Sequence, residues 1–398
     1  MQNMNRKKIK VLHLFNTYLP NTENWAYHLI SNTPNTKVFI AAQKYIQGSF
    51  PNNQFSFYHH SFDKIQDQYI QLSKKHPIQL AQKIYLRLFK YPKLLLDGIE
   101  AFARKNEIDI IHVHFANMAW FYRSLAQKLN KPFVISFYGW DYEQLPYLYP
   151  KFKQRFKILF AKADALLCEG PHGAQILESH GCPKEKIHVV KLGVKVDQIK
   201  FVSRPKKANE LQLIQLATFT QKKGHIYTVQ AFRQALVSCP NMSLTLVGGD
   251  AGVKEKIKEY ISVHQLSEKI TIIDAIDYAL LYSFLADYQV FIQPSCYADD
   301  MDCEGGAPVA LLDAQATGMP VIGTTHCDIP MEVIDEKTGL LSPEKDISCL
   351  AENIKRFYEM GQVEYDSFAK AGRRHVEKEF DIKKNARLLF DIYASIKQ

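Results

Sequence analysis

Short, almost wholly apolar runs alternate with longer amphipathic segments along most of the chain. Runs rich in Val and Ile, bounded by Gly, Pro or polar residues, are typical of strands buried on both faces, and the amphipathic segments between them predict helices. The ten runs cover residues 9–15, 37–42, 108–115, 132–138, 165–170, 211–217, 244–249, 270–274, 290–295 and 320–324. This alternation predicts an α/β fold whose parallel sheets carry helices on both faces.

The length of the chain predicts two domains rather than one. A single hydrophobic core rarely serves 398 residues, and the polar segment VSRPKKANE at 202–210 separates two series of strands and helices. We therefore expect one Rossmann-like, doubly wound domain over residues 1–201 and a second over residues 202–379, facing each other across a cleft. Ligands of such sheets bind at the carboxyl ends of the strands.

Positive charge is concentrated in the first half of the chain. Residues 1–200 hold 28 Lys and Arg against 14 Asp and Glu, whereas the remaining residues hold 22 against 27. A basic half beside a slightly acidic one indicates that the first domain meets an anionic partner. Nucleic acid, a phospholipid surface and a phosphate-bearing acceptor all qualify on charge alone.

The seven cysteines are scattered and form no Cys-x-x-Cys pair, which fits a reduced cytosolic protein with buried thiols. The spacing of Cys296, Cys303, His326 and Cys327 matches no standard zinc pattern, so we expect no metal. No apolar run reaches the roughly 18–20 residues that span a bilayer.

One segment, residues 64–104, departs from the alternation. It is expected to be helical with interruptions at Pro77 and Pro92, and it interleaves lysines with aromatic and leucine side chains. A basic, aromatic amphipathic helix suits the interface of an anionic membrane, which would place a cytoplasmic protein at the inner face of that membrane. An ordinary surface helix, with solvated lysines and inward-facing aromatics, fits the same pattern.

The stretch 302–330 carries the most functional information. Glu304 precedes the turn Gly305-Gly306-Ala307-Pro308, and Asp313 lies in the helical run that follows. Small residues let a ligand approach the backbone, and a helix beginning after Pro308 directs free N–H groups at that ligand. Two carboxylates flanking such a turn suit a polyol, whose hydroxyls donate hydrogen bonds to them.

Further polar residues follow other predicted strands. Lys222, Lys223 and Gly224 stand between the strand 211–217 and a helix, where lysine charge and helix N–H groups suit a diphosphate. In the first half, the turn after the first strand holds Asn21, Thr22 and Glu23, which we expect to face the cleft and to contact acceptor or phosphate. His114 ends another strand, where a structural role is the alternative to a functional one.

Together these motifs resemble those of retaining GT-B glycosyltransferases of family 4, over nearly the whole chain and most closely from 186 to 339. The resemblance implies that Glu304 contacts the donor sugar, that Lys223 binds the donor diphosphate and that Asp313 holds the ribose diol. It also implies that the final helix, over 380–398, crosses back to the first domain. The remaining donor-side positions that it implies are Lys222, Gly224, Gly248, Gly249, Ala275, Ile276, Gly305, Gly306, Ala307 and Pro308.

The chain departs from that pattern at three positions. Thr218 stands where the family has the Arg of its phosphate clamp, and Lys222 is the candidate substitute. Asp313 lies nine residues after Glu304, whereas the family places a Glu eight residues after. Tyr138 replaces the family's His in Ser-Phe-His-Gly-Tyr-Asp, although Gly139 and Asp141 match. Tyrosine donates hydrogen bonds well but is a poor base near neutrality.

The resemblance implies retaining transfer of a hexose from a nucleotide diphosphate sugar, UDP-linked by preference and GDP-linked otherwise. The acceptor would be a hydroxyl of a glycan or lipid-linked molecule in surface polysaccharide biosynthesis, with no metal and no nucleic acid partner. Glu304, Lys223 and Tyr138 are the expected catalytic residues. A non-catalytic GT-B partner subunit and a GT-B sugar-nucleotide epimerase or phosphorylase are the competing interpretations.

Overall fold

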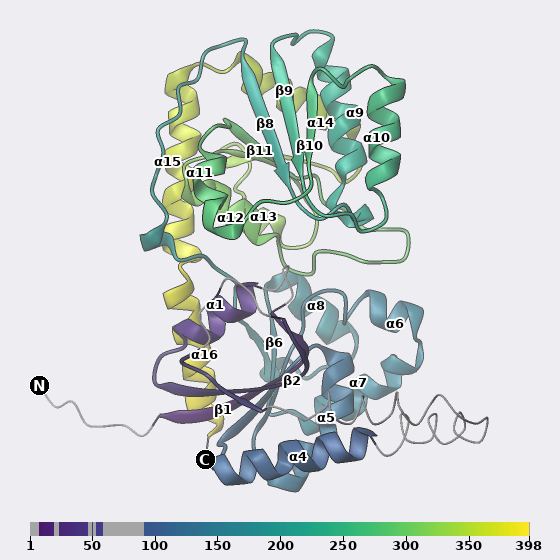
Figure 1. Cartoon of the computed structure of the whole chain (residues 1–398), viewed down its shortest axis with the longest axis vertical. Helices are drawn as coiled ribbons and strands as arrows, with labels where there is room; N and C mark the ends of the chain where they lie inside the picture. The colour runs from purple at the N-terminus through teal and green to yellow at the C-terminus, as the bar shows by residue number, and fades with distance from the viewer. Residues whose placement is uncertain (1–7, 20–23, 47–49, 51–52, 59–90, 398) are drawn as a thin grey trace, which may run out of the picture.

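Two parallel β-sheets, one in each half of the chain, form the centres of two lobes stacked along the long axis of the molecule (Figure 1). The computed structural model describes residues 8–19, 24–46, 50, 53–58 and 91–397. Helices cover both faces of each sheet, so the predicted α/β fold with two doubly wound sheets is confirmed.

The first lobe is built on a seven-stranded sheet in the order β3-β2-β1-β4-β5-β6-β7. The order reverses between β1 and β4, which makes the carboxyl ends of these two strands the topological switch point of the lobe. Its strands are β1 (Ile9–Tyr18), β2 (Thr36–Tyr45), β3 (Ser56–Tyr58), β4 (Ile110–His114), β5 (Phe133–Ser136), β6 (Ala165–Cys168) and β7 (Ile187–Val189). Its helices are α1 (Asn24–Asn32), α4 (Tyr91–Asn106), α5 (Ala116–Leu129), α6 (Gln144–Leu148), α7 (Lys151–Lys162) and α8 (Pro171–Ser179).

The second lobe holds a six-stranded sheet in the order β10-β9-β8-β11-β12-β13, with its switch point between β8 and β11. Its strands are β8 (Leu211–Leu216), β9 (Met242–Val247), β10 (Ile270–Ile273), β11 (Val290–Ile292), β12 (Val321–Thr324) and β13 (Gly339–Ser342). Its helices are α9 (His225–Leu236), α10 (Lys254–Val263), α11 (Leu281–Leu285), α12 (Val309–Ala316), α13 (Ile329–Glu332), α14 (Ile347–Glu359) and α15 (Gln362–Glu379).

All ten strands predicted from the apolar runs are present, and the described residues add β3, β7 and β13. These three strands are three or four residues long, and each lies at an edge of its sheet. A short edge strand has too few buried positions to produce a continuous apolar run, so the sequence pattern misses it.

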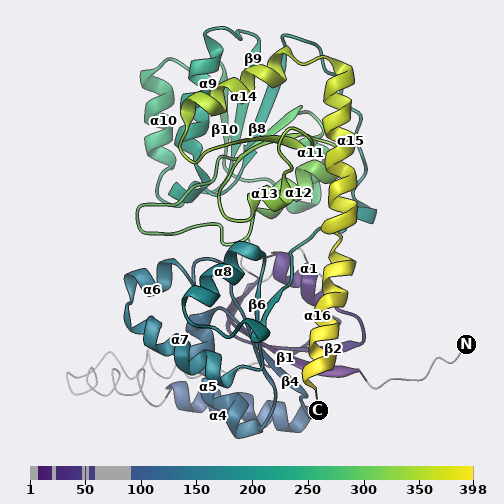
Figure 2. The same ribbon diagram turned by 180° about the vertical axis from the view of Figure 1, so that it is seen from behind.

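The last helix, α16 (Ile382–Ile396), packs on the first lobe although it follows the second in sequence (Figure 2). Leu389 and Tyr393 enter the core formed by Val11, Ile110 and other residues of the first sheet. The chain passes between the lobes twice, and the two passages run side by side. The amide of Val194 donates to the carbonyl of Phe380 at 3.0 Å.

The described part of the basic segment is an amphipathic surface helix. Helix α4 is described from Tyr91 to Asn106, and the chain before Tyr91, including Pro77, lies outside the described residues, so the interruptions expected at Pro77 and Pro92 stay predictions. Leu95 and Ile99 face the core, whereas Lys93 is exposed. Residues 64–90, which carry most of the lysine and aromatic pattern, lie outside the described residues.

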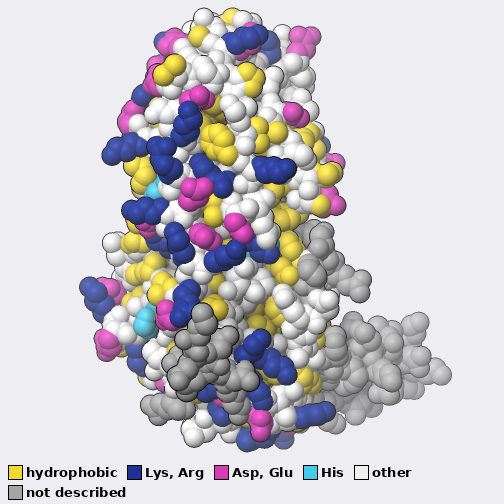
Figure 3. Space-filling view, turned by 90° about the vertical axis from the view of Figure 1, so that its left-hand side faces the viewer, with side chains coloured by type: hydrophobic (Ala, Val, Ile, Leu, Met, Phe, Trp, Pro, Cys, Tyr) yellow, Lys and Arg dark blue, Asp and Glu magenta, His cyan; other side chains and the backbone are white. Residues whose placement is uncertain are grey.

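Within the described part of the chain, no helix combines the length and apolar character that a membrane crossing requires. On the side of the molecule along which α15 and α16 run, Lys and Arg side chains are interspersed with Asp and Glu (Figure 3). The positive charge of that side is therefore partly balanced by neighbouring carboxylates.

Candidate functional site

Lys223 and Glu304 meet at the switch point of the second lobe. Lys223 ends a short turn between β8 and α9, and Glu304 lies in the loop between β11 and α12. Because β8 and β11 pair in parallel, their carboxyl ends place both loops at one edge of the sheet. The Lys223 Nζ atom lies 2.5 Å from Glu304 Oε2.

The Glu304 carboxylate is enclosed, with a side chain that is only 5% exposed. Ser295 Oγ donates to its Oε1 atom at 2.6 Å, and Gln293 Nε2 lies 3.4 Å from the same oxygen. Burial alone would raise the pKa of Glu304, but the charges of Lys223 and Lys222 and the hydrogen bonds to the carboxylate outweigh it and lower the pKa to about 2. Glu304 is therefore an ionised acceptor at neutral pH.

Lys222 and Gly224 shape the loops around this pair. Lys222 Nζ donates to Asp302 Oδ1 at 3.0 Å and to the Cys303 carbonyl at 2.8 Å, so in this conformation its ammonium holds the loop that carries Glu304. Gly224 adopts φ +69°, and a Cβ there would lie 2.0 Å from the carbonyl oxygen of Pro294. Thr218 is half-buried on the same edge of the sheet.

The glycine turn after Glu304 lies directly against the first lobe. Gly139 and Gly305 have φ of +89° and +80°, and a Cβ on Gly139 would lie 2.4 Å from the Gly305 Cα atom. The Gly306 amide donates to Glu169 Oε2 in the first lobe at 2.9 Å. Ala307 and Pro308 follow, and α12 begins at the next residue. The lobes are thus closed over the turn.

Asp313 is buried beneath this turn, where Tyr282 donates to its Oδ1 atom at 2.9 Å. Burial raises the pKa of Asp313 to about 7, although the hydrogen bond from Tyr282 lowers it. Ile276 packs in the same hydrophobic cluster as Tyr282, and Ala275 beside it is exposed. These residues therefore share one side of the carboxyl edge.

Gly248 and Gly249 follow β9 on that edge. A Cβ on Gly248 would lie 1.9 Å from the Ala217 carbonyl oxygen, whereas one on Gly249 would meet nothing within 4 Å. Gly248 thus permits close approach of two loops, and Gly249 is exposed.

Tyr138 in the first lobe belongs to a chain of hydrogen bonds. Its hydroxyl lies 2.7 Å from His114 Nδ1, and His114 Nε2 lies 3.0 Å from His13 Nδ1. Both histidines are buried, and burial holds their pKa values well below the ordinary range, so they are neutral. His114 orients the Tyr138 hydroxyl from behind, since its own side chain is fully buried.

Asp141 is fully buried beneath Tyr138. Its two oxygens accept from the backbone amides of Tyr138 and Ala116, each at 2.8 Å. Burial raises the pKa of Asp141 to about 7, although these hydrogen bonds lower it. Asp141 thus ties together the loops after β4 and β5. Residues 21–23, the other acceptor-side candidates, lie outside the described residues.

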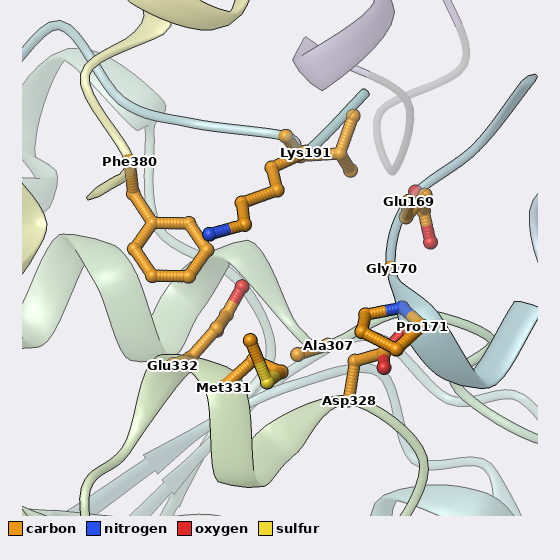
Figure 4. A pocket seen from close by; sticks show the side chains of 10 residues that line it. Glu169, Gly170, Pro171, Lys191, Ala307, Asp328, Met331, Glu332 and Phe380 are labelled. Carbon is orange, nitrogen blue, oxygen red and sulfur yellow. The ribbon is translucent and has the colours of Figure 1, made fainter. Parts of the chain in front are cut away.

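The structure adds a group of carboxylates between the lobes that sequence reasoning missed (Figure 4). Glu169 of the first lobe and Asp328 and Glu332 of the second line one pocket, with Lys191 at its side. Burial raises the pKa of Glu169 to about 8 and that of Asp328 to about 6. Single acids on separate loops form no motif, so no sequence signal connects them.

The sequence matches two known families in succession. Residues 56–198 match Glycosyltransferase Family 4, and residues 196–375 match the glycosyl transferases group 1 family. AmsK of Erwinia amylovora, an amylovoran biosynthesis glycosyltransferase, is 29% identical over 297 residues, which cover 73% of this chain and 71% of AmsK. WcaL of Escherichia coli K12, named for colanic acid biosynthesis, is 32% identical over 241 residues, which cover 60% of this chain and 57% of WcaL.

Solved structures share the whole architecture. A glycosyltransferase from Rickettsia africae ESF-5 superposes with a TM-score of 0.73 at 17% identity and covers 98% of both chains. Anabaena HepE, in complex with UDP and glucose, superposes with a TM-score of 0.70 at 13% identity over 97% of this chain and 100% of HepE. Together the family matches and the two-lobed fold show that the chain belongs to the family 4 glycosyltransferases of GT-B fold.

Proposed function

We propose that this chain is a retaining hexosyltransferase that moves a hexose from a nucleotide diphosphate sugar, preferably UDP-linked, to a hydroxyl of a glycan or lipid-linked acceptor. The observation that carries the proposal is the contact between Lys223 Nζ and Glu304 Oε2 at the switch point of the second lobe. A cation for the departing diphosphate and an ionised acceptor for sugar hydroxyls stand there side by side.

In this proposal the diphosphate is stabilised by Lys223 and by the amides of the turn Gly305–Ala307 ahead of α12, and the Gly306 amide exchanges Glu169 for it. Glycosyl transfer builds negative charge on the diphosphate as the bond to the sugar breaks. A lysine and helix N-terminal amides aimed at that charge act as preorganised electrostatic stabilisation, which a metal supplies in other enzymes. When the donor binds, Lys223 releases Glu304 and pairs with the diphosphate. Glu304 then accepts hydrogen bonds from sugar hydroxyls.

The ribose and the base of the donor are proposed to bind along the same edge of the sheet. Asp313 is the proposed ribose ligand, and Ala275 and Ile276 are proposed to border the base through their backbone. Gly248 and Gly249 allow the nucleotide to approach the end of β9. Tyr282, which donates to Asp313, and Ile276 pack against the same hydrophobic cluster, which supports a single pocket for ribose and base.

The first lobe is proposed to bind the acceptor and to close over the sugar. Tyr138, whose hydroxyl is oriented by His114, is placed to donate to a sugar hydroxyl. Retention is explained if the leaving phosphate takes the acceptor proton and the acceptor attacks from the face that the phosphate vacates. No protein base is then required, and a tyrosine in place of histidine is compatible with catalysis.

The names of AmsK and WcaL support surface polysaccharide biosynthesis as the process served. The proposed location is the cytoplasm, with residues 64–104 as the candidate contact with anionic membrane. Liposome co-sedimentation of the wild type and of a variant with neutralised lysines in that segment tests the contact, and equal binding of both would contradict it.

Incubation with labelled nucleotide sugars tests the activity. Wild type is expected to transfer or hydrolyse the hexose of at least one UDP- or GDP-hexose. The substitution Glu304→Gln is expected to abolish both activities. Glu255→Gln, on the exposed face of α10, is the control and should leave activity unchanged. Full activity of Glu304→Gln would contradict the proposed site.

The products of the same incubation separate the competing functions. Binding of a nucleotide sugar without turnover would favour a non-catalytic subunit. Release of a sugar phosphate in the presence of inorganic phosphate would favour a phosphorylase, and recovery of an epimerised donor would favour a sugar-nucleotide epimerase.

A further inference from the structure

Four metal-ligating side chains from both lobes meet at the interface, directly beside the proposed donor site. Glu143 precedes α6 and His172 lies in the first turn of α8, whereas Cys303 and Cys327 follow β11 and β12 of the second lobe. His172 Nε2 lies 3.4 Å from Glu143 Oε2, and Cys303 Sγ lies 2.6 Å from the same oxygen. The ligand atoms of Glu143, His172 and Cys327 all lie within 4.8 Å of one another.

Cys327 links the two sides of this cluster. Its sulfur lies 3.2 Å from His326 Nε2 and within 4.8 Å of the ligand atoms of Glu143 and His172. Its backbone adopts φ +45°, a left-handed conformation that non-glycine residues rarely take and that recurs at functional sites. Cys327 therefore lies beside two imidazoles, those of His172 and His326, and the Glu143 carboxylate.

Neighbouring groups orient the ligands as an outer shell does in metal sites. Tyr297 donates to Glu143 Oε1 at 2.7 Å, which leaves Oε2 facing Cys303 and His172. The His172 amide donates to Asp328 Oδ1 at 2.9 Å and so fixes the start of α8 against the second lobe. Such outer contacts hold the ligating side chains in place for an ion.

We propose that Glu143, His172, Cys303 and Cys327 form an interdomain binding site for a zinc-type divalent cation that holds the two lobes together. Thiolate and imidazole ligands favour zinc over magnesium or calcium, which prefer oxygen ligands. Glu143, His172 and Cys327 already lie within 4.8 Å of one another, and approach of the Cys303 thiol, which contacts Glu143 Oε2, would complete the tetrahedral shell typical of structural rather than catalytic zinc. This inference is independent of the proposed function.

This site shares only its two cysteines with the group Cys296, Cys303, His326 and Cys327, whose spacing matches no standard zinc pattern. Cys296 contacts the Gln221 carbonyl at 3.9 Å, on another loop. His326 Nε2 lies 3.2 Å from Cys327 Sγ, but that nitrogen accepts from the Glu304 amide at 3.2 Å and Nδ1 lies 2.7 Å from Glu344 Oε1, so both ring nitrogens are engaged. Their places are taken by Glu143 and His172, which come from the other lobe. No spacing pattern in the sequence connects those two residues with the cysteines.

Metal analysis of the full chain tests the proposal. The protein is stripped with a chelator, reconstituted with Zn²⁺, and assayed by plasma mass spectrometry after removal of unbound metal. One zinc per chain is expected. Cys327→Ser and Cys303→Ser are expected to weaken binding at least about tenfold, as metal-site variants commonly do. Cys239→Ser, at a buried cysteine in the core of the second lobe, should bind as wild type does.

His172→Asn and Glu143→Gln provide variants that keep the cysteines, in case the serine variants fail to fold. With Co²⁺ in place of zinc, wild type should show thiolate-to-cobalt absorption that the serine variants lose. Less than stoichiometric zinc in the reconstituted wild type, unchanged zinc affinity in all four variants, or a Cys303–Cys327 disulfide in the protein as purified would overturn the proposal.

Small-angle X-ray scattering tests the position between the lobes. Addition of Zn²⁺ to the stripped wild type should reduce the radius of gyration, and Cys327→Ser should show no such change. Zinc bound at one equivalent without any change in scattering would overturn its assignment as an interdomain clamp.

Discussion

Gly139 and Gly305, which come from different lobes, touch so closely that a Cβ on either would lie 2.4 Å from the Cα atom of the other. Both adopt positive φ, so each position is restricted by backbone conformation as well as by space. The closed arrangement of the two lobes therefore depends on two residues without side chains.

Gly139→Ala is expected to hold the lobes apart. The added methyl group would overlap the Gly305 backbone, which cannot move aside as a flexible side chain can. Transfer activity should fall at least about tenfold, because raising the free energy of the closed, reactive state by about 1.4 kcal/mol lowers the rate by that factor. The rate of transfer is measured together with the radius of gyration by small-angle scattering.

Gly361→Ala is the matched control for this change. Gly361 precedes α15, has negative φ, and a Cβ there would meet nothing within 4 Å. It should leave both activity and scattering unaltered. Wild-type activity in Gly139→Ala would show that this contact is not needed for turnover.

Asp141→Ala is expected to destabilise the first lobe by about 2 kcal/mol or more, since it leaves two buried backbone donors without acceptors. Chemical denaturation measures the loss. Asp97→Ala, at an exposed position on α4 beside Lys128, should cost at most about 0.5 kcal/mol. Equal effects of the two changes would contradict the structural role of Asp141.

Glu169 makes stability depend on pH. Burial raises its pKa from 4.5 to about 8, so the folded chain keeps a proton that the unfolded chain loses as the pH rises from about 4.5 to 8. The contribution of this carboxyl to the free energy of unfolding is therefore fully present below pH 4.5, and it is lost as the pH rises through 8.

Glu169→Gln keeps an acceptor for the Gly306 amide but carries no charge. Relative to wild type, the free energy of unfolding of this variant should rise by roughly 4 kcal/mol at pH 8 and by about 1 kcal/mol at pH 5, because each pKa unit between the unfolded and folded values corresponds to about 1.36 kcal/mol. Thermal denaturation across this range measures the difference, with Glu185→Gln, at an exposed position of the same lobe, as control. A gain that is the same at both pH values would refute the assigned cause.

The strand–helix alternation was sufficient to predict the fold because buried parallel strands such as β6 and β11 are continuous apolar runs. The same pattern placed Lys223 and Glu304 at strand ends, and parallel pairing brings strand ends to one edge. It could not reveal Glu169, Glu143 or His172. Their importance lies in contacts across the interface, and those contacts depend on how the two lobes close rather than on any local pattern.

The roles of individual residues were harder to predict than their places. Asp141 has the position of a ligand-facing acid in the motif, yet both of its oxygens are used by backbone amides. Lys222 is engaged by Asp302 and the Cys303 carbonyl. In both cases the competing partners are backbone groups or side chains of loops whose conformation the sequence alone does not specify.

The central claim is that Lys223, paired with Glu304, binds the diphosphate of a nucleotide donor. Isothermal titration calorimetry with UDP and with GDP measures this directly on wild type, on Lys223→Ala, and on Lys258→Ala, a control at a lysine on α10 whose side chain is 48% exposed. Wild type and Lys258→Ala are expected to bind at least one of these nucleotides with equal affinity, whereas Lys223→Ala should bind it at least about tenfold more weakly, a loss of about 1.4 kcal/mol. Failure of wild type to bind either nucleotide, or unchanged affinity in Lys223→Ala, would contradict the central claim.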